Sequence, residues 1–288
     1  MRITRLKDKK CFITGAASGI GRAVAEAAAA EGAELFLTDI NAPQLEAVVA
    51  QIRGSGGTVN LSRALDISDF DSVRQFARDI HASCGSMDVV MNIAGISVWG
   101  AVENLEHQDW RRCVDINLMG PIHVIECFIP EMIRAGRGGH LVNVSSAAGL
   151  FGLPWHAAYS ASKFGLRGIS EVLRFDLKRH GIGVSLVCPG GVNTGLVNSI
   201  EIRGIDDSDR AVIATKEHFR KRAKTPAQAA AAIIKGVKSN SYMVFTSFDI
   251  RLGYWSQRVF APPYEFIMTL LNNRLHALAT RADTSAPE

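Results

Sequence analysis

Seven short apolar segments recur between residues 10 and 246, and they constrain the fold more than any other feature of this sequence. They read CFIT, ELFLT, TVNLSRAL, MDVVMN, HLVNVSS, GVSLVC and SYMVFT, and the stretches between them have helical character. Strands that alternate with helices along a chain favour a parallel sheet with helices on both faces. The sequence therefore predicts an α/β fold built on a doubly wound, seven-stranded parallel sheet.

A glycine-rich turn follows the first of these segments and leads into an alanine-rich helix. Gly15, Gly19 and Gly21 lie in the sequence GAASGIGR and carry no side chain that would keep a phosphate away from the backbone. The amide groups at a helix start, together with the helix dipole, favour negative charge. Such a connection can also serve without a ligand, but its position after an apolar strand favours a dinucleotide cofactor.

Asp39 ends the second apolar segment, eighteen residues after Gly21. A carboxylate at this point can accept hydrogen bonds from the adenosine ribose hydroxyls and would repel a 2′-phosphate. No Arg or Lys stands beside it, and Ser18 occupies a position where a phosphate-binding cation could have stood. We therefore predict NAD, with NADP disfavoured. Alternatively, Asp39 and Asn41 resemble a turn that caps the next helix, and both roles can coexist.

Tyr159 and Lys163 are four residues apart in the sequence AAYSASKFGL. On a helix this spacing puts both side chains on one face. A neighbouring ammonium favours the phenolate and lowers the pKa of a tyrosine, so the pair suits general acid–base chemistry on an alcohol or a carbonyl. Alone, the pair is a weak signal, because Tyr and Lys at this spacing are common on helix surfaces without any function.

Five motifs occur together and in order along the chain. They are TGAASGIG at 14–21, NIAG at 92–95, Asn117 within DINLMG, VNVSS at 142–146 and YSASK at 159–163. Together they resemble the short-chain dehydrogenase/reductase (SDR) family, in its branch of single-domain enzymes, from about residue 8 to 195. The resemblance implies a Rossmann fold and hydride transfer between a nicotinamide cofactor and a substrate carbon.

The resemblance implies a catalytic tetrad of Asn117, Ser146, Tyr159 and Lys163. Tyr159 would exchange a proton with the substrate oxygen, and Ser146 would hydrogen-bond to the same oxygen. Lys163 would bind the nicotinamide ribose and lower the pKa of Tyr159, while Asn117 would hold a water that links Lys163 to a proton relay. Ser146 is assigned in preference to Ser145 because it lies thirteen residues before Tyr159.

The same resemblance implies contacts to the cofactor. Asp66 and Ile67 match the positions that border the adenine, and Thr194 matches a threonine that reaches the nicotinamide carboxamide. Two departures are mild: NIAG stands where NNAG is more frequent, and Gly191 stands where a larger residue is common, which is expected to loosen the substrate loop. The implied cofactor contacts are Gly15, Ser18, Gly19, Ile20, Gly21, Asp39, Asp66, Ile67, Asn92, Ala94, Gly95, Tyr159, Lys163, Pro189, Gly190, Val192 and Thr194.

Composition narrows the function classes. The net charge of +4 over 288 residues is too mild to indicate a nucleic-acid-binding protein. The start of the chain is charged and lacks the apolar run of a signal peptide. Eight histidines are dispersed, and no metal site is expected. Five scattered cysteines without a CxxC pair predict free thiols and a cytoplasmic location: Cys11, Cys84, Cys113, Cys127 and Cys188.

We expect one domain. Residues 1–246 would form the NAD-binding catalytic part, with a substrate lid at about 192–224, and residues 247–288 would be an apolar C-terminal extension of it. The lid ends in KEHFRKRAK, which suits either a solvated helix face or a docking surface for an acidic carrier. His156, three residues before Tyr159, either faces the substrate or has a surface or helix-cap role.

The extension is rich in aromatic and aliphatic residues. Pro262, Pro263 and several charges interrupt it, so it cannot span a bilayer, which requires about 20 apolar residues. Three roles compete: a cap over the substrate, an oligomer interface, and a helix in peripheral contact with a membrane. We favour cap or interface. Either would enclose an apolar pocket with residues from two loops: Val98, Trp99, Leu150, Phe151, Leu153 and Trp155.

These features predict an NAD-dependent dehydrogenase of a lipophilic secondary alcohol or ketone, steroid-like or terpenoid-like. The first alternative is a reductase of 3-oxoacyl groups on a carrier protein or coenzyme A. The second is an NAD-sensing protein that binds the cofactor without turnover. The resemblance further implies a homodimer or homotetramer formed through the helices that carry Asn117 and Tyr159.

Overall fold

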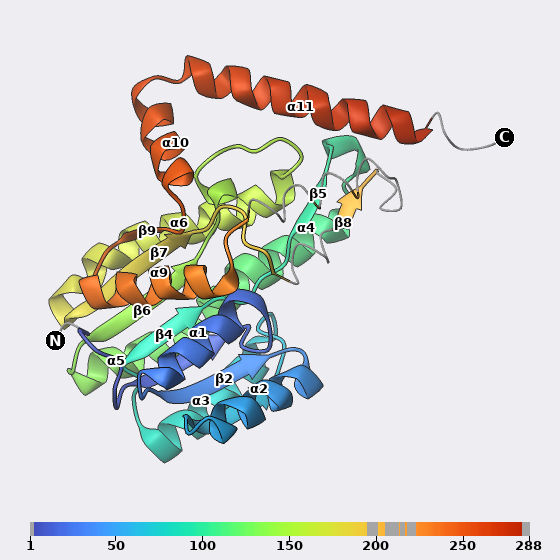
Figure 1. Ribbon diagram of the computed structural model, residues 1–288. Helices are drawn as coiled ribbons and strands as arrows, with labels where there is room; N and C mark the ends of the chain where they lie inside the picture. Colours follow the sequence, from blue (N-terminus) through green and yellow to red (C-terminus); the bar gives the residue numbers. More distant parts are fainter. Residues whose placement is uncertain (1–2, 195–200, 205–212, 214–216, 218–222, 284–288) are drawn as a thin grey trace.

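Seven parallel strands form the central sheet, in the order β3–β2–β1–β4–β6–β7–β9 (Figure 1). The computed structural model describes residues 3–194, 201–204, 213, 217 and 223–283. The strand order reverses between β1 and β4, as in doubly wound folds, so the predicted fold class is confirmed. The strands are β1 (Lys10–Thr14), β2 (Glu34–Asp39), β3 (Thr58–Ala64), β4 (Val89–Asn92), β6 (Gly139–Val144), β7 (Ile182–Cys188) and β9 (Met243–Phe245).

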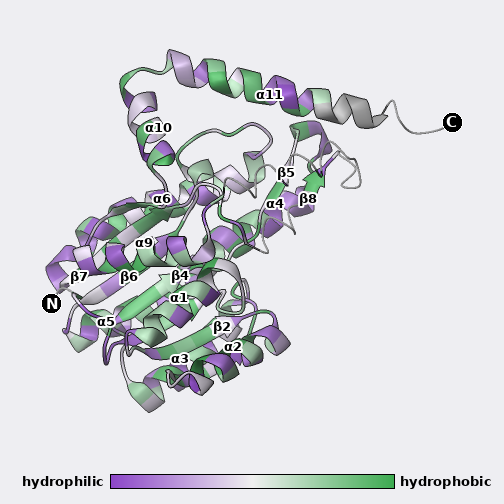
Figure 2. Ribbon diagram, viewed as in Figure 1, coloured by the Kyte–Doolittle hydropathy of each residue, from purple (hydrophilic) through white to green (hydrophobic). Residues whose placement is uncertain are grey.

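The central strands are buried along almost their whole length. Phe12 of β1 lies opposite Val90 of β4, which lies opposite Leu141 of β6. Every residue of β4 and β6 is buried, and Figure 2 shows hydrophobic colour along β4. A parallel strand covered on both faces carries an unbroken apolar run, which explains why these strands were predictable from short segments of sequence.

Helices cover both faces of the sheet. On one face Val24 of α1, Leu45 of α2 and Ile233 of α9 join the same buried cluster. On the other face Phe76 of α3 and Phe128 of α5 pack around Phe12. The helices are α1 (Gly19–Ala30), α2 (Ala42–Gly54), α3 (Phe70–Cys84), α4 (His107–Val114), α5 (Gly120–Ala135), α6 (Ala157–Asp176) and α9 (Pro226–Ser239), with 3-10 turns at Val102–Asn104, Ala147–Gly149 and Lys178–His180.

Helices α4 and α5 are joined by a π-helical turn at Asp115–Met119, which contains Asn117. The joined stretch His107–Ala135 is the one helix in the described part of the chain that is long and apolar enough to cross a membrane. It packs one side against the fold, where Asn117 and Phe128 are fully buried, and 39% of its most apolar window is buried. Single π turns inside α-helices are frequent at functional sites, and this one carries a residue of the implied tetrad.

A second, two-stranded parallel sheet was not predicted. It pairs β5 (Val98–Gly100) with β8 (Glu201–Arg203), so that Trp99 lies opposite Ile202. The guanidinium of Arg203 donates to both carboxylate oxygens of the buried Asp109, at 2.8 to 3.2 Å. This strand lies in the middle of the predicted lid. Residues 195–200 and most of 205–222, including nearly all of the basic cluster, lie outside the described residues.

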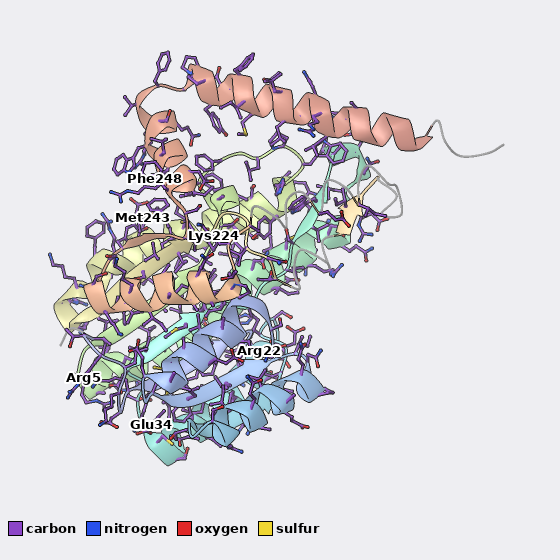
Figure 3. The ribbon with its side chains drawn as sticks, viewed as in Figure 1. Arg5, Arg22, Glu34, Lys224, Met243 and Phe248 are labelled. Carbon is purple, nitrogen blue, oxygen red and sulfur yellow. The ribbon has the colours of Figure 1, made fainter. Side chains whose placement is uncertain are left out.

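The C-terminal extension forms two helices, α10 (Phe248–Val259) and α11 (Pro262–Asp283). Figure 1 shows α11 as a long arm above the ends of α6 and β5, and Figure 3 marks Phe248 at the base of α10. Pro262 is the first residue of α11, a position that needs no amide donor. The two prolines therefore separate two helices and do not break one.

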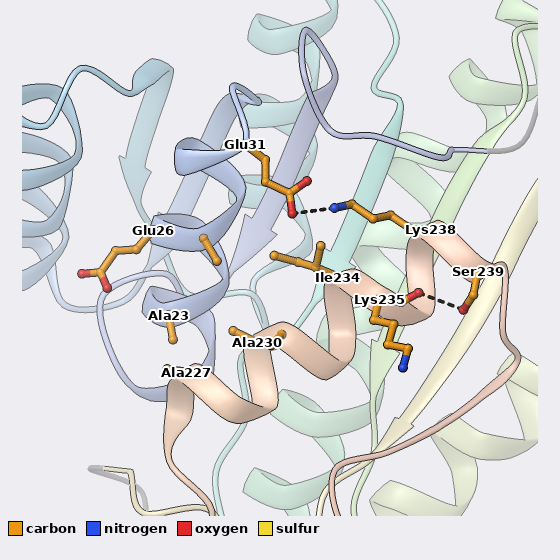
Figure 4. A pocket seen from close by; sticks show the side chains of 11 residues that line it. Ala23, Glu26, Glu31, Ala227, Ala230, Ile234, Lys235, Lys238 and Ser239 are labelled. Atoms are coloured by element: carbon orange, nitrogen blue, oxygen red, sulfur yellow. Dashed lines mark hydrogen bonds and ion pairs between the residues drawn. The ribbon is translucent and has the colours of Figure 1, made fainter.

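Small side chains line the seam between α1 and α9 (Figure 4). Ala23, Ala27 and Ala230 lie along this groove, and Lys238 donates to Glu31 at 2.6 Å at its end. Alanines let the two helices approach closely. None of the residues that line this groove borders the candidate active site described below, so we assign it to helix packing.

Candidate active site

A groove opens at the carboxyl ends of β1, β2 and β4, where the strand order reverses. Ligands of doubly wound sheets bind at this point. The groove has a volume of about 340 Å³. Eleven of the implied cofactor contacts line it: Gly15, Ser18, Gly19, Ile20, Gly21, Asp39, Asp66, Ile67, Ala94, Gly95 and Thr194.

The glycine turn is shaped by close backbone contacts. A Cβ on Gly21 would lie 2.0 Å from the carbonyl oxygen of Gly15, and Gly15 itself has a φ of +70°. Gly19 also has a positive φ, and a Cβ there would come within 3.1 Å of Thr194. Ser18 is exposed at the N-cap of α1, and its hydroxyl makes no capping hydrogen bond. The hydroxyl and the helix start therefore face a potential phosphate together.

Asp39 is held in place by two backbone amides. Its carboxylate accepts from the amide of Ala17 at 3.0 Å and from that of Asn41 at 3.0 Å. The helix cap itself is Asn41, whose side chain accepts from the amide of Gln44. The turn role and the groove-facing position of Asp39 thus coexist, and its negative charge lies at the groove surface.

The adenine end of the groove has an acidic residue beside an apolar one. Asp66 accepts from the amide and the hydroxyl of Ser68, both at 2.8 Å. Ile67 is buried against Gly120, where a Cβ would come within 2.6 Å of it. Sequence reasoning left out four apolar lining residues, although three of them are chain neighbours of predicted contacts: Ile40, Leu65, Ile93 and Ile116.

Six implied cofactor contacts do not line the groove. Two of them, Tyr159 and Lys163, are described below, and the other four are bonded within the fold. Asn92 is buried and donates to the side-chain oxygen of Asn143 at 2.9 Å, so it joins β4 to β6. The carbonyl of Pro189 accepts from Ala147. Gly190 and Val192 are likewise engaged with Thr246 and Lys224. These residues hold the ends of the strands in place. From the sequence alone, this structural role could not be told apart from contact with the cofactor.

Tyr159 and Ser146 face each other across the end of β6. Tyr159 is buried, and the Ser146 hydroxyl lies near enough to it to act on its pKa. The Ser146 oxygen also accepts from the amide of Ala148 at 3.1 Å. Ser145 is turned away, because its hydroxyl donates to the carbonyl of Lys163 at 2.9 Å. The geometry therefore supports the choice of Ser146.

Lys163 and Asn117 meet beside Gly95. A Cβ on Gly95 would lie 2.7 Å from Asn117 Oδ1 and 3.3 Å from Lys163 Nζ. Asn117 accepts from the amide of Ile96 and donates to the Ile96 carbonyl and to Ser162. Both donors of its amide are thus used, one to hold the loop after β4 and the other to bond to α6. A water at this position would have to be held by other atoms of Asn117.

Burial changes the pKa values of both Tyr159 and Lys163. Burial raises the pKa of Tyr159 to about 12, although the hydrogen bond from Ser146 acts in the other direction. Burial also lowers the pKa of Lys163 to about 8. The expected lowering of the pKa of Tyr159 by Lys163 together with a cationic cofactor therefore stays a prediction, because burial dominates in the protein alone. Lys163 Nζ donates to the Val144 carbonyl at 3.0 Å and lies 5.7 Å from the Tyr159 ring centre.

The residues of the groove fit a nicotinamide dinucleotide. An uncapped helix start at Ser18 suits the phosphates, and the fixed carboxylate of Asp39 suits a ribose. Lys163 lies beside Gly95, which lines the groove, and Tyr159 lies next to Lys163. No group of three or more metal-ligating side chains occurs among the residues that the structure describes.

Comparison with known proteins identifies the family. Residues 9–203 match the short chain dehydrogenase family. The chain is 39% identical over 192 residues to D-threitol dehydrogenase of Mycolicibacterium smegmatis, covering 67% of this chain and 73% of the relative. It is 31% identical to C alpha-dehydrogenase of Sphingobium, covering 86% and 83%. It is also 34% identical to the 3-oxoacyl acyl-carrier-protein reductase FabG of Thermotoga maritima, covering 68% and 79%.

Solved structures agree with this assignment. A short chain dehydrogenase/reductase of Burkholderia phymatum in complex with NAD matches with a TM-score of 0.79 and 26% identity, covering 89% of this chain and 95% of that one. A metagenomic short-chain oxidoreductase in complex with NADP matches with a TM-score of 0.66 and 30% identity, covering 83% and 96%. The chain therefore belongs to the short-chain dehydrogenase/reductase family and is an NAD(P)-dependent oxidoreductase.

Proposed function

We propose that this protein is an NAD-preferring dehydrogenase of a lipophilic secondary alcohol, with Tyr159 as its general acid–base. The observation that carries the proposal is the contact of Tyr159 with Ser146, beside Lys163, at the end of the dinucleotide groove. The two dehydrogenases among the relatives, which are named for threitol and for a Cα position, support an alcohol as the substrate.

In this mechanism the bound cofactor supplies the hydride acceptor and the positive charge of an oxidised nicotinamide. Ser146 holds the substrate oxygen by a hydrogen bond, and Tyr159 removes the hydroxyl proton. Because Tyr159 is protonated at neutral pH in the protein alone, it needs added positive charge to act as a base. Lys163, whose pKa is about 8, is still largely charged at neutral pH and supplies part of that charge.

The preference for NAD rests on Asp39. Its carboxylate is fixed by Ala17 and Asn41 at the groove surface, where it would accept from ribose hydroxyls and repel a 2′-phosphate. Relatives of known structure hold either NAD or NADP, so the charge of Asp39 in this chain supports the choice. An oxidised NAD pool favours alcohol oxidation as the working direction.

A lipophilic substrate is supported by the aromatic residues of the loop before α6. Phe151 and Trp155 are buried on the loop before α6, and the Phe151 ring lies 6.2 Å from that of Tyr264 in α11. The ring of Trp155 lies 5.4 Å from that of His276, also in α11. These contacts support the role of the extension as a cap, and a steroid-like or terpenoid-like alcohol would suit such a wall.

Assembly and location remain predictions. Apolar side chains of α6 are exposed, including Phe164, Val172 and Phe175. An exposed apolar face on this helix supports a homodimer or homotetramer formed through the helices that carry Asn117 and Tyr159. The five cysteines are free thiols, which suits the predicted cytoplasmic location. Reduction of 3-oxoacyl thioesters is the second candidate function, supported by the relative that has this activity in its name.

The test is a titration with NAD(H) and NADP(H), followed by nicotinamide absorbance assays on steroid alcohols, terpenoid alcohols and 3-hydroxyacyl thioesters. Tyr159→Phe keeps the ring and should lower kcat/KM at least about 100-fold, since general acid–base catalysis contributes about 10²–10⁴. Ser145→Ala is the matched control and should retain turnover. Survival of Tyr159→Phe within tenfold contradicts the mechanism, and NADPH-dependent reduction of thioesters alone moves the protein to the second candidate.

Asp39→Ser tests the cofactor assignment in the same assay. The variant should lose roughly tenfold in selectivity for NAD over NADP, because it removes a charge that repels the 2′-phosphate. Asp39→Asn keeps the shape and an acceptor oxygen but removes the negative charge. It therefore shows how much of the selectivity comes from the charge and how much from hydrogen bonds to the ribose. An unchanged selectivity in both variants would leave Asp39 as a turn residue only.

A further inference from the structure

His156 is a buried histidine that the mechanism above does not use. It lies three residues before Tyr159, at the position that caps α6, but its side chain makes no capping hydrogen bond. It is 8% exposed. The surface role that the sequence allowed is therefore wrong. His156 does occupy the N-cap position of α6, but with its backbone and not its ring, so a different reason is needed for a polar ring in this place.

One ring nitrogen of His156 is fixed by the backbone. Nδ1 lies 2.6 Å from the carbonyl oxygen of Pro154, and since a carbonyl can only accept, Nδ1 carries the proton and donates. Burial lowers the pKa of His156 to about 4, so the ring is neutral at physiological pH. Nε2 then carries a lone pair and can only accept a hydrogen bond.

The second nitrogen makes no hydrogen bond with any described residue. Nε2 is also absent from the set of buried polar atoms that are sealed off without a partner, so this atom keeps some accessible surface. His140 provides the contrast within the same molecule. It is a core histidine, 1% exposed, and its Nε2 is satisfied by the hydroxyl of Ser185 at 2.8 Å. Buried polar atoms are normally paired, and Nε2 of His156 lacks such a protein partner.

The ring of His156 is held rigidly next to the reacting tyrosine. The ring of Trp99 lies 4.2 Å from it, and Trp99 is itself fixed by a hydrogen bond from its indole nitrogen to Ser97 at 2.7 Å. The rings of His156 and Tyr159 are 6.4 Å apart. On its other side Trp155 has a φ of +66°, a strained conformation for a bulky residue, and its carbonyl is bound by the amide of Gly100.

From this geometry we infer that His156 Nε2 is a substrate-binding acceptor, which receives a hydrogen bond from a second hydroxyl of the alcohol that Tyr159 oxidises. The inference rests on the proposed function and narrows its substrate class. The substrate is a lipophilic alcohol with a further hydroxyl group a few bonds from the reacting carbon, such as an aryl diol. One hydroxyl meets Tyr159 and Ser146, and the other meets the imidazole.

The test compares two probes of nearly equal shape, 1-phenylethane-1,2-diol and 1-phenylpropan-1-ol, which differ by a hydroxyl in place of a methyl group. The wild-type protein should show roughly tenfold higher kcat/KM for the diol, because a polar site discriminates against a ligand that leaves it unpaired. His156→Phe should lower the ratio of the two kcat/KM values roughly tenfold, mainly through KM. His156→Asn offers an amide oxygen as acceptor and should recover part of the ratio.

His107→Phe is the matched control, since it makes the same change at an exposed histidine of α4 and should leave the ratio unchanged. A wild-type ratio near one overturns the inference. A His156→Phe variant that lowers both kcat/KM values equally does so too, and assigns His156 a merely structural role. Either result leaves the dehydrogenase itself in place as long as an alcohol is oxidised with NAD.

A binding measurement covers the case in which His156→Phe does not fold or neither probe turns over. Quenching of tryptophan fluorescence in the wild-type protein saturated with NADH reports on Trp99 beside His156. The diol should bind roughly tenfold more tightly than the mono-alcohol. Equal affinity, or no binding of either probe, overturns the inference, whereas failure of all alcohols with both cofactors counts against the proposed function.

Discussion

The dinucleotide groove and the C-terminal extension are built in opposite ways. Around the groove the backbone is closely packed, so a Cβ added to Gly21 or Gly95 would collide with neighbouring atoms. In the extension, a stripe of large apolar residues on α10 faces outward at helical spacing. These residues are Phe248, Leu252, Trp255 and Val259, which are 75, 58, 54 and 84% exposed.

The extension touches the rest of the molecule at only a few places. Tyr254 of α10 is buried, and the hydroxyl of Tyr264 in α11 accepts from the amide of Gly152 at 2.9 Å. This difference indicates that the groove and the extension have separate roles, the first in binding the cofactor and the second in covering the substrate. Substitutions in the groove should affect folding and cofactor affinity, whereas those in the extension should affect which substrate is covered.

The largest effect is expected at the glycine turn. In Gly21→Ala the new Cβ would lie 2.0 Å from the Gly15 carbonyl oxygen, so the turn has to move away from α1. Overpacking of this kind costs about 1–3 kcal/mol or more, and we expect cofactor affinity to fall by at least about tenfold for each 1.4 kcal/mol lost at the phosphate. Isothermal titration with NAD checks this.

Gly54→Ala provides the control for Gly21→Ala. Gly54 is the last residue of α2, and nothing lies within 4 Å of the added Cβ. This variant should bind NAD as the wild type does and be equally stable or more stable by about 0.5 kcal/mol. Equal NAD affinity in both variants would contradict this prediction, because it would show that an added Cβ is tolerated in the groove as well as at the surface.

The next effect in size is the pH dependence of stability caused by Lys163. Burial lowers its pKa from 10.5 to about 8. Between these values the unfolded chain binds more protons than the folded protein, so stability rises with pH. At about pH 7 the charged lysine lowers the free energy of unfolding by its full amount. As the pH rises to about 9.5 the buried lysine loses its proton, and the free energy of unfolding increases by about 2 kcal/mol.

Lys163→Met removes this titration. Between about pH 7 and pH 9.5 the free energy of unfolding of the wild type should rise by about 2 kcal/mol more than that of the variant. Urea unfolding at the two pH values measures this difference. The difference between the two pH values is insensitive to the loss of the hydrogen bond to Val144, which is the same at both. A constant difference would show that the lysine is not held in a desolvated site.

The smallest effect is expected in the extension. Tyr264→Phe removes the hydroxyl that bonds to Gly152 and should cost about 1 kcal/mol of local stability, seen as faster amide exchange in α11. The affinity for NAD should stay the same, while KM for a bulky alcohol should rise. Thr269→Val is the control, because its hydroxyl bonds only within α11, to the Glu265 carbonyl. A change in NAD affinity would contradict the separation of the two regions.

The sheet and most of the groove were predictable from the sequence because local patterns encode them. Several strands of the main sheet are short runs of mostly apolar, buried residues, as in β1 and β4, and the glycine turn lies directly between β1 and α1. The short pair of β5 and β8 was missed because its stability depends on Arg203 and Asp109, which are 94 residues apart. The burial of Tyr159, Lys163 and His156, which sets their pKa values, likewise depends on tertiary packing and could not be read from spacing.

The attachment of β8 to β5 has a consequence for chain entropy. Between Thr194 and Lys224 the chain is fixed in the middle, where Arg203 binds Asp109. The bond between Arg203 and Asp109 closes a loop across 94 residues of the chain. The entropy of closing a loop grows only slowly with its length, by about 0.6 kcal/mol for each doubling. Residues added between Asp109 and Arg203 should therefore weaken this closure only slightly.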